Sequence, residues 1–339
     1  MDRLNAVAKP LEGTKSLKNT PWVIVLTASA GLLAACSGNT SGSNASSSSA
    51  PGSSPAARSG NAAKTIGVSI QDLEAQFYQQ METGMQSEAG KYGYKLIFVD
   101  ANRDNARQQS QVEDFISRRV DAIVLTPYDS QAIGSAISEA NNAKIPVFTA
   151  DIANTSKQGR VISHVASNNV QGGQQAGMLM CKAVGNSGSV AILDEPEVTS
   201  VQDRVKGFKL ALAQHCPNVK VVADTDSGGT RTKASNDMSD ILQAHRDLKG
   251  VFGINDDSAL GAVTAIRQAG VTNVAVVGYD ATPEARTAIA NGSMYGDAVQ
   301  YPDQIGRKTI DVIHDHFNGK QPPARIDVPV GTYTKANAH

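Results

Sequence analysis

Residues 152–170 read IANTSKQGRVISHVASNNV, and they interrupt an otherwise regular alternation of strand and helix patterns. The stretch contains no amphipathic helix, and its one extended piece lies around Val161–Val165. On both sides of it, short Val- and Ile-rich runs are each followed by a longer amphipathic segment. Near-continuous apolar strands separated by helices are typical of parallel sheets covered on both faces. We therefore interpret residues 152–170 as a crossover between two open sheets of four or five strands each, an α/β architecture.

The alternation itself extends over residues 65–291. Its units could instead close into a single (β/α)8 barrel, but a barrel does not explain the interruption after the fourth strand. The predicted strands are Thr65–Ile70, Lys95–Val99, Ala122–Thr126, Pro146–Ala150, Ser189–Leu193, Val219–Ala223, Val251–Ile254 and Val274–Gly278. The predicted helices are Phe77–Tyr92, Asn105–Arg119, Gln131–Asn142, Gln171–Val184, Val201–Ala213, Lys233–Ala244, Ser258–Ala269 and Pro283–Asn291.

The N-terminal residues have the pattern of an export signal. Residues 22–35 (WVIVLTASAGLLAA) form an apolar run, too short to span a membrane comfortably, that follows several lysines. The run closes with LAAC at 33–36, which resembles a bacterial lipobox and implies cleavage before Cys36 and diacylation of its thiol. We expect residues 1–35 to be a lipoprotein signal peptide. The alternative is an ordinary signal peptide in which Cys36 is incidental.

The segment that begins at Cys36 is predicted to be a tether. Residues 36–63 are rich in Ser, Gly, Ala, Asn and Pro and contain almost no bulky apolar side chain. Such a segment cannot bury enough surface to offset the entropy lost on ordering, so we expect a flexible linker of roughly 30 Å. The protein is then extracytoplasmic, on the periplasmic side or at the cell surface, and its lipid is its one attachment to a bacterial membrane.

Composition and charge exclude several classes of function. The 339 residues include 31 basic and 32 acidic side chains, so the net charge of −1 argues against a nucleic-acid partner. Three cysteines are too few for a disulfide-built scaffold or a four-thiolate zinc site. No G-x-G-x-x-G follows the first strand, and His314 and His316 lie on different helix faces, so neither a cofactor nor a metal is predicted. No arrangement of Ser, His and acidic residues in the sequence suggests a catalytic nucleophile, so no enzymatic activity is predicted.

Polar side chains follow most of the predicted strands. Open parallel sheets bind ligands at the carboxyl ends of their strands. Carboxylates are strong acceptors for the hydroxyl groups of a hydroxyl-rich ligand. The alternative for any one position is that Asp or Asn caps the following helix. The side chains in question are Gln71, Asp72, Thr126, Asp151, Asp194, Glu195, Asn255, Asp256 and Asp280.

From Thr65 to the C-terminus, the chain resembles a type I periplasmic substrate-binding protein of the ribose-binding kind. Such proteins serve ABC importers of monosaccharides. The resemblance rests on motifs that occur in the family's order. They are TIGVSI (65–70) with Phe77-Tyr78, AIVLTPY (122–128), IPVFTAD (145–151), DRVKGF (203–208), VFGINDDSALG (251–261), VVGYDATP (276–283) and QYPDQIG (300–306).

The resemblance implies two Rossmann-like lobes joined by three crossovers, with the sugar in the cleft between them. The first lobe is expected to comprise residues 64–166 and 301–328, and the second lobe residues 167–300 and 329–339. The crossovers are expected near Val165–Ser167, Val299–Pro302 and Val328–Val330. The implied partners are the permease and ATPase subunits of an ABC transporter, and the protein is expected to be a monomer without catalysis.

The resemblance also implies a role for each site residue. Phe77 and Tyr78 are expected to lie against the C–H face of the sugar, and Asp151 and Asp280 to accept from its vicinal hydroxyls. Arg204 is expected to supply a cation, and Asn255 and Gln300 are expected to supply amide groups that both donate and accept hydrogen bonds. The ligand-binding residues predicted in this way are Phe77, Tyr78, Thr126, Asp151, Arg204, Asn255, Asp280 and Gln300, with Gln71, Asp72 and Arg231 as secondary candidates.

Four departures from the ribose-type pattern change the predicted ligand. Ile152 stands where the ribose type has an Arg, and the loop at Gly229 lacks the expected aromatic ring. Ala75 and Thr126 stand where amides are usual. A pocket that loses a cation and a ring should not prefer ribose, so a pentose, a hexose in another ring form and a sugar alcohol remain open. Arg231 could partly replace the missing cation.

Two further alternatives remain open at this point. The fold would equally suit a sensor subunit for chemotaxis or for a sugar-like signalling molecule. Cys181 and Cys216 lie at the ends of two consecutive predicted helices, in an oxidising compartment. They either form a disulfide or remain two buried thiols.

Overall fold

The structure, a computed structural model, describes residues 63–338. The predicted signal peptide, Cys36 and nearly all of the predicted linker lie outside these residues. Within residues 63–338, no helix combines the length and the apolar character that crossing a membrane requires.

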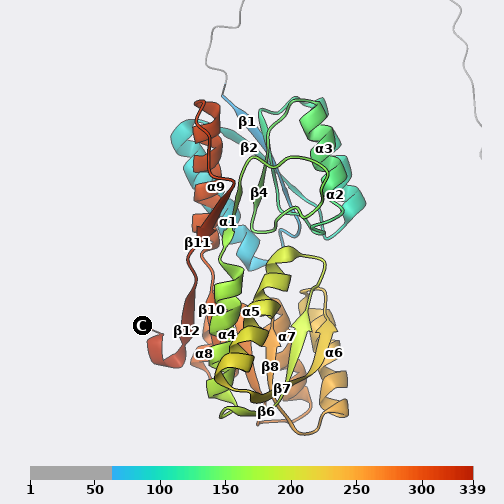
Figure 1. Cartoon of the computed structure of the whole chain (residues 1–339), viewed down its shortest axis with the longest axis vertical. Helices are drawn as coiled ribbons and strands as arrows, with labels where there is room; N and C mark the ends of the chain where they lie inside the picture. The colour runs from blue at the N-terminus through green and yellow to red at the C-terminus, as the bar shows by residue number, and fades with distance from the viewer. Residues whose placement is uncertain (1–62, 339) are drawn as a thin grey trace, which may run out of the picture. The chain divides into compact units, whose positions relative to one another are not determined.

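Two six-stranded sheets organise residues 63–338 (Figure 1). The strand order of the first sheet is β11-β5-β4-β3-β1-β2, and all of its neighbouring strands are parallel. Its strands are β1 (Thr65–Ile70), β2 (Lys95–Asp100), β3 (Ala122–Leu125), β4 (Val147–Ala150), β5 (His164–Ser167) and β11 (Arg325–Val328).

The second sheet has the order β12-β10-β9-β8-β6-β7. Its strands are parallel except for the edge strand β12, which runs antiparallel to β10. The strands are β6 (Ser187–Asp194), β7 (Asn218–Asp226), β8 (Leu248–Gly253), β9 (Ala275–Asp280), β10 (Gly296–Val299) and β12 (Gly331–Thr334). Two open sheets exclude the alternative of a (β/α)8 barrel.

Helices cover both faces of each sheet (Figure 1). On the first sheet, α1 and α9 bury one apolar face, and α2 and α3 bury the other. On the second sheet, α4 and α5 cover one face, and α6, α7 and α8 cover the other. The helices are α1 (Gln76–Tyr92), α2 (Asn105–Ser117), α3 (Gly134–Asn142), α4 (Asn169–Ala183), α5 (Thr199–His215), α6 (Arg231–Ala244), α7 (Asp256–Gln268), α8 (Pro283–Ala290) and α9 (Pro302–Phe317).

We call the first sheet with α1, α2, α3 and α9 the first lobe, and the second sheet with α4–α8 the second lobe. The chain passes between them three times: between β5 and α4, between β10 and α9, and between β11 and β12. The first crossover, expected near Val165–Ser167, lies directly after these residues, because they belong to β5 and pair with β11. The extended piece expected around Val161–Val165 likewise lies at His164–Ser167.

The prediction of four or five strands in each sheet is also wrong. The strands that it omitted, β10, β11 and β12, are four residues long and read GDAV, RIDV and GTYT. Such short and partly polar sequences lack the apolar run that marks a buried strand. They become strands because a neighbouring strand offers each of them hydrogen-bond partners: β9 pairs with β10, β10 with β12, and β5 with β11.

Candidate functional site

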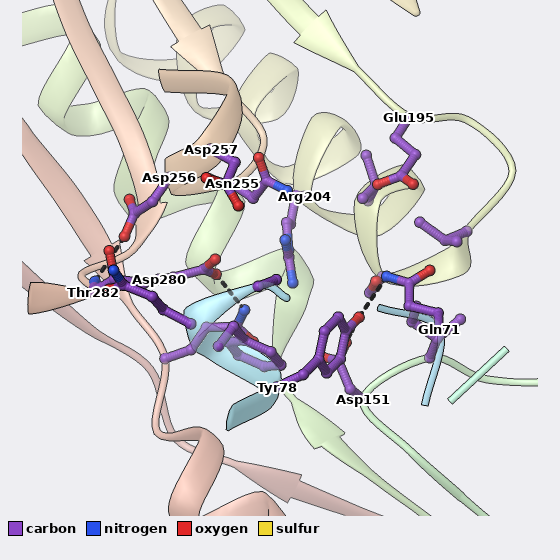
Figure 2. Close-up of a pocket in the computed structure, with 18 of the residues that line it drawn as sticks. Gln71, Tyr78, Asp151, Glu195, Arg204, Asn255, Asp256, Asp257, Asp280 and Thr282 are labelled. Atoms are coloured by element: carbon purple, nitrogen blue, oxygen red, sulfur yellow. Dashed lines mark hydrogen bonds between the residues drawn. The ribbon is translucent and has the colours of Figure 1, made fainter. Parts of the chain in front are cut away.

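One pocket is lined by residues that follow the carboxyl ends of strands in both sheets (Figure 2). Seven of the eight predicted ligand-binding residues line it, as do two of the three secondary candidates. These nine residues are Phe77, Tyr78, Asp151, Arg204, Asn255, Asp280, Gln300, Gln71 and Arg231.

Thr126 and Asp72 are not among the residues that line the pocket. Thr126 is fully buried after β3, and its carbonyl accepts a hydrogen bond from Gln108. Asp72 instead accepts a 2.9 Å hydrogen bond from the guanidinium of Arg103. The prediction that Thr126 lines the site therefore differs from the structure, in which the Thr126 side chain is fully buried within the first lobe.

Asp151 is the first carboxylate of the pocket. It follows β4 with a left-handed φ of 63°, a conformation that costs energy for a non-glycine residue. Its Oδ2 accepts a 3.0 Å hydrogen bond from the hydroxyl of Tyr78, which in turn accepts one of 2.6 Å from Gln71. Burial raises the pKa of the Asp151 carboxyl, and the charge of Arg204 acts against this shift.

Asp280 is the second carboxylate, at the end of β9, with a φ of 120°. Its Oδ1 accepts a 2.7 Å hydrogen bond from the amide of Gln300. Burial raises the pKa of Asp280 well above its usual value, and the charge of Arg204 opposes this rise. One guanidinium therefore stabilises both aspartates in their charged form.

The helix pair α4–α5 positions Arg204, which is 4% exposed. A Cβ at Gly173 would collide with the backbone of Arg204, so only glycine lets α4 approach α5 this closely. The Arg204 side chain donates from Nε to Asn169 at 3.0 Å and from Nη1 to the carbonyl of Ile254 at 2.8 Å. Its guanidinium also lies 4.2 Å from the ring centre of Tyr279. Arg204 is thus held in place before any ligand contacts it.

Several buried acceptors at the pocket have no hydrogen-bond partner within residues 63–338. A buried polar atom is costly to leave without a partner, so such atoms indicate a bound group that supplies donors. All of these atoms are amide or carboxylate oxygens, which accept hydrogen bonds but do not donate them. A ligand with several hydroxyl groups matches this requirement. The atoms are Oε1 of Gln71, Oδ1 of Asp151 and Oε1 of Gln300.

Aromatic side chains supply the apolar part of the pocket. Phe77 and Tyr78 lie in the first turn of α1, with ring centres 5.1 Å apart and ring planes at 90°. Both rings are at least nine-tenths buried. We expected both ring faces to pack on the ligand, but the Tyr78 hydroxyl is already bonded to Asp151 and Gln71. Tyr78 therefore also orders the polar side of the pocket.

Asn255 and Arg231 are largely engaged within the second lobe. Asn255 caps α7 by accepting a hydrogen bond from the backbone N–H of Ser258, and it donates one to the carbonyl of Gly229. This is the helix-capping role that was the alternative for polar residues after strands. Arg231 forms ion pairs with Asp257 and Glu284. Arg231 is therefore not free to replace the missing cation, and the Asn255 amide is not free to donate to a ligand.

The sequence reasoning missed one cation of the pocket. Arg103 follows β2 and lines the pocket, where its Nη1 donates to Glu195 at 2.8 Å. Arg103 was not predicted because it lies three residues beyond the end of β2 and not directly after it. Asp257, Thr282 and Ser200 also line the pocket without having been predicted as site residues. Among residues 63–338, no group of His, Cys, Asp and Glu side chains is arranged to hold a metal ion.

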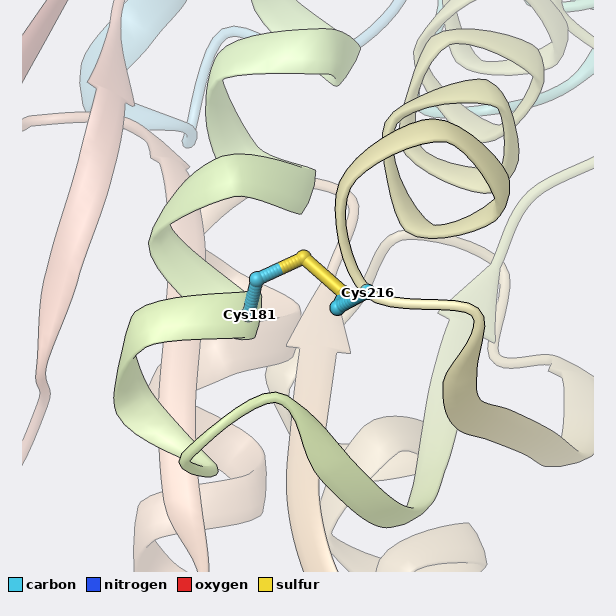
Figure 3. The surroundings of a disulfide bond; sticks show 2 residues. All are labelled: Cys181 and Cys216. Atoms are coloured by element: carbon cyan, nitrogen blue, oxygen red, sulfur yellow. A yellow bond between two sulfur atoms is a disulfide. The ribbon is translucent and has the colours of Figure 1, made fainter.

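Away from the pocket, Cys181 and Cys216 form a disulfide (Figure 3). Cys181 lies near the end of α4, and Cys216 directly follows α5. Their Cα atoms are 5.8 Å apart, within the usual range for a disulfide. The bond joins the two helices that position Arg204. Of the two alternatives that the sequence left open, a disulfide or two buried thiols, the structure has the disulfide.

Comparisons with known proteins identify the family. Residues 66–321 match the family described as periplasmic binding protein domain. The ribose import binding protein RbsB of Salmonella typhimurium is 38% identical over 265 residues, 78% of this chain and 88% of that protein. RbsB of Bacillus subtilis is 34% identical over 314 residues, 92% of this chain and 98% of that protein.

Solved structures agree with this assignment. An ABC transporter solute-binding protein from Agrobacterium vitis with bound α-D-tagatopyranose matches with a TM-score of 0.77 and 27% identity, over 81% of this chain and 95% of that one. The predicted fold and the resemblance to type I periplasmic substrate-binding proteins are thereby confirmed. The chain belongs to the periplasmic binding protein family.

Proposed function

We propose that this protein is the extracytoplasmic solute-binding component of an ABC importer and that it binds a monosaccharide or a sugar alcohol. The observation that carries the proposal is the set of buried, unpartnered acceptors around Arg204, because a ligand rich in hydroxyl groups would satisfy them together. The ring of Phe77 supplies an apolar surface for the C–H face of such a ligand.

The known ligands of related proteins support this class. Relatives include a xylitol-binding protein of Mycolicibacterium smegmatis and a D-apiose import binding protein of Actinobacillus succinogenes. Similar structures hold D-allose or myo-inositol. The class of polyhydroxylated ligands is thus shared, while the individual sugar differs among these proteins.

Two positions argue that the preferred ligand is not ribose. Ile152 lines the pocket, where the ribose-type pattern has an arginine. Gly229 has a φ of 60° and adjoins Glu195 and Asn255, so no aromatic ring fits there. We propose that a pentose other than ribose, a hexose in another ring form, or a polyol occupies the pocket.

We propose further that binding is coupled to closure of the two lobes. Asp151 and Phe77 belong to the first lobe, whereas Arg204 and Asp280 belong to the second. A ligand that contacts both sets favours the closed form by its higher affinity for that form. The permease and ATPase would recognise the closed protein, and a diacylated Cys36 would retain it at the membrane. Mass spectrometry of the protein isolated from membranes tests the lipid directly.

A thermal-shift panel of pentoses, hexoses, xylitol and myo-inositol tests the proposed ligand class. A ligand present at 100 times its dissociation constant should stabilise the protein by about 2.7 kcal/mol. Asp280→Asn should abolish the shift, and Asp240→Asn, an exposed substitution on α6, should retain it. If no member of the panel shifts the melting temperature, the proposal is wrong. If ribose alone does, the argument from Ile152 and Gly229 is wrong.

A further inference from the structure

Arg103 forms an ion pair between the two lobes. It lies in the turn after β2, where Asn102 and Arg103 both have left-handed φ values of 51° and 55°. Within its own lobe, its Nε donates to Oδ2 of Asp72 at 2.9 Å. Its Nη1 donates to Oε1 of Glu195 at 2.8 Å and to the carbonyl oxygen of Gly228 at 2.6 Å, both in the second lobe.

This ion pair is shielded from water, unlike most ion pairs of the protein. The Arg103 side chain is 17% exposed and that of Glu195 only 3% exposed. For comparison, Arg118 and Asp114 form an ion pair in the first lobe with exposures of 55% and 49%. Exposed pairs contribute little, whereas removing one partner of a buried pair leaves a charge without compensation.

The glycine-rich loop of the second lobe is shaped around this pair. Gly228 and Gly229 have φ values of 55° and 60°, a conformation that favours glycine. A Cβ at Gly229 would collide with the carboxylate of Glu195. The loop that lacks the expected aromatic ring thus leaves room for Glu195 and presents the Gly228 carbonyl to Arg103. The absence of an aromatic ring from this loop and the presence of Arg103 in the pocket are therefore structurally linked.

We propose that Arg103 and Glu195 form a closure-dependent ion pair that stabilises the ligand-bound form and forms one side of the binding pocket. This inference rests on the proposed function. When the lobes separate, Arg103 keeps its partner Asp72, but Glu195 loses Arg103 and returns to water. The pair therefore exists only in the closed form, and its free energy adds to the apparent affinity for the ligand.

The environment of Glu195 gives this proposal a distinctive pH dependence. Burial raises the pKa of Glu195, and the charges of Arg103 and then Arg204 lower it. Without Arg103, Glu195 can be buried on closure more easily when it is protonated. Closure should then take up a proton, and affinity should increase as the pH falls. The charged and titratable groups that face Glu195 are Arg103, Arg204, Glu197, Tyr78 and Tyr128.

The test compares Arg103→Ala, Glu195→Gln and the double variant by isothermal titration calorimetry with the sugar that stabilises the wild type most. Arg103→Ala should weaken binding at pH 7 by at least about tenfold. The double variant should recover most of that loss, because the most deeply buried charge, that of Glu195, is then absent, while Asp72 loses Arg103 equally in both variants. Arg118→Ala, which removes the exposed pair of the same lobe, should bind like the wild type.

The pH series separates this role from a merely structural one. Between pH 7 and pH 5, the affinity of Arg103→Ala should increase several-fold relative to the double variant, which lacks the carboxylate. Equal affinities of wild type and Arg103→Ala, or parallel pH profiles of the single and double variants, would overturn the proposal. A wild type that binds no sugar in the panel would overturn the proposed function and this inference together.

Discussion

The hydroxyl of Tyr78 donates a 3.0 Å hydrogen bond to Oδ2 of Asp151, and the other carboxylate oxygen of Asp151 has no partner within residues 63–338. The aromatic residue thus orients the carboxylate and leaves its Oδ1 available to a ligand hydroxyl. Because Tyr78 itself accepts from Gln71, the three side chains form one hydrogen-bonded chain along the wall of the pocket.

Tyr78→Phe tests this orientation. The variant keeps the ring but removes a hydrogen bond to a carboxylate, so we expect sugar affinity to fall by about tenfold. Because that hydrogen bond lowers the pKa of Asp151, the loss of affinity on acidification should also begin at a higher pH than in the wild type. Calorimetric titrations from pH 5 to pH 8 measure both effects. Tyr295→Phe, a partly exposed tyrosine of the second lobe, serves as the control; an unchanged Tyr78→Phe would contradict the proposed orientation.

Arg204→Lys tests whether geometry matters in addition to charge. Lysine retains the positive charge but cannot reproduce the bonds to Asn169 and Ile254 together with the stacking on Tyr279. We expect affinity to fall by about 100-fold or more, as judged by titration calorimetry.

Arg286→Lys is the matched control for that experiment. Arg286 also donates to a backbone carbonyl and lies 4.3 Å from a tyrosine ring centre, but it does not line the pocket. If both lysine variants lose the same affinity, the effect comes from the stability of the second lobe and not from contact with the ligand.

Asp256 and Asp297 form a buried carboxyl pair behind the pocket. Both are at least 97% buried, and a Cβ at Gly278 would meet an oxygen of each. Burial raises the pKa of Asp297 to about 7, and burial followed by the charge of Asp297 raises that of Asp256 well above its usual value. Between pH 4 and pH 7 the folded protein therefore holds a proton that the unfolded chain releases.

This pair predicts a stability that falls as the pH rises. A raised folded-state pKa contributes stability that is fully present below the unfolded pKa of about 3.9 and is lost as the pH rises through about 7. Asp297→Asn removes the ionisation, so its free energy of unfolding relative to the wild type should be higher at pH 8 than at pH 5, by on the order of 1–3 kcal/mol. Denaturant unfolding at both pH values measures the difference. The same difference in Asp240→Asn, or none in Asp297→Asn, would refute the assignment.

The disulfide should matter for stability more than for binding. It closes a loop with a sequence separation of 35 between α4 and α5, so replacing both cysteines with alanine should lower the free energy of unfolding by about 3–4 kcal/mol. Both cysteines lie outside the pocket, so sugar affinity should change by less than about threefold. Denaturant unfolding and calorimetry of the same samples measure the two quantities. A large loss of affinity with unchanged stability would show that the bond positions Arg204 directly.

Much of the fold could be predicted because its signals are local. Each long strand, such as β1 or β9, is an apolar run recognisable from its own residues. The interruption at residues 152–170 indicated two sheets. The short strands could not be predicted, since Arg325–Val328 is a strand only because the edge of β5 is there to pair with it.

The sequence alone determined which side chains gather at one end of each sheet, because a parallel strand places the residue after its last position at the same edge as its neighbours do. Asp151 and Asp280 could be identified for that reason, whereas Arg204 lies within α5 and was identified through the resemblance of DRVKGF (203–208) to a family motif. Only the tertiary structure decided what these side chains contact. Arg103 and Glu195 are 92 positions apart, and nothing in either local sequence specifies the other. Their ion pair depends on how the two lobes meet, which is set by contacts between residues far apart in the sequence.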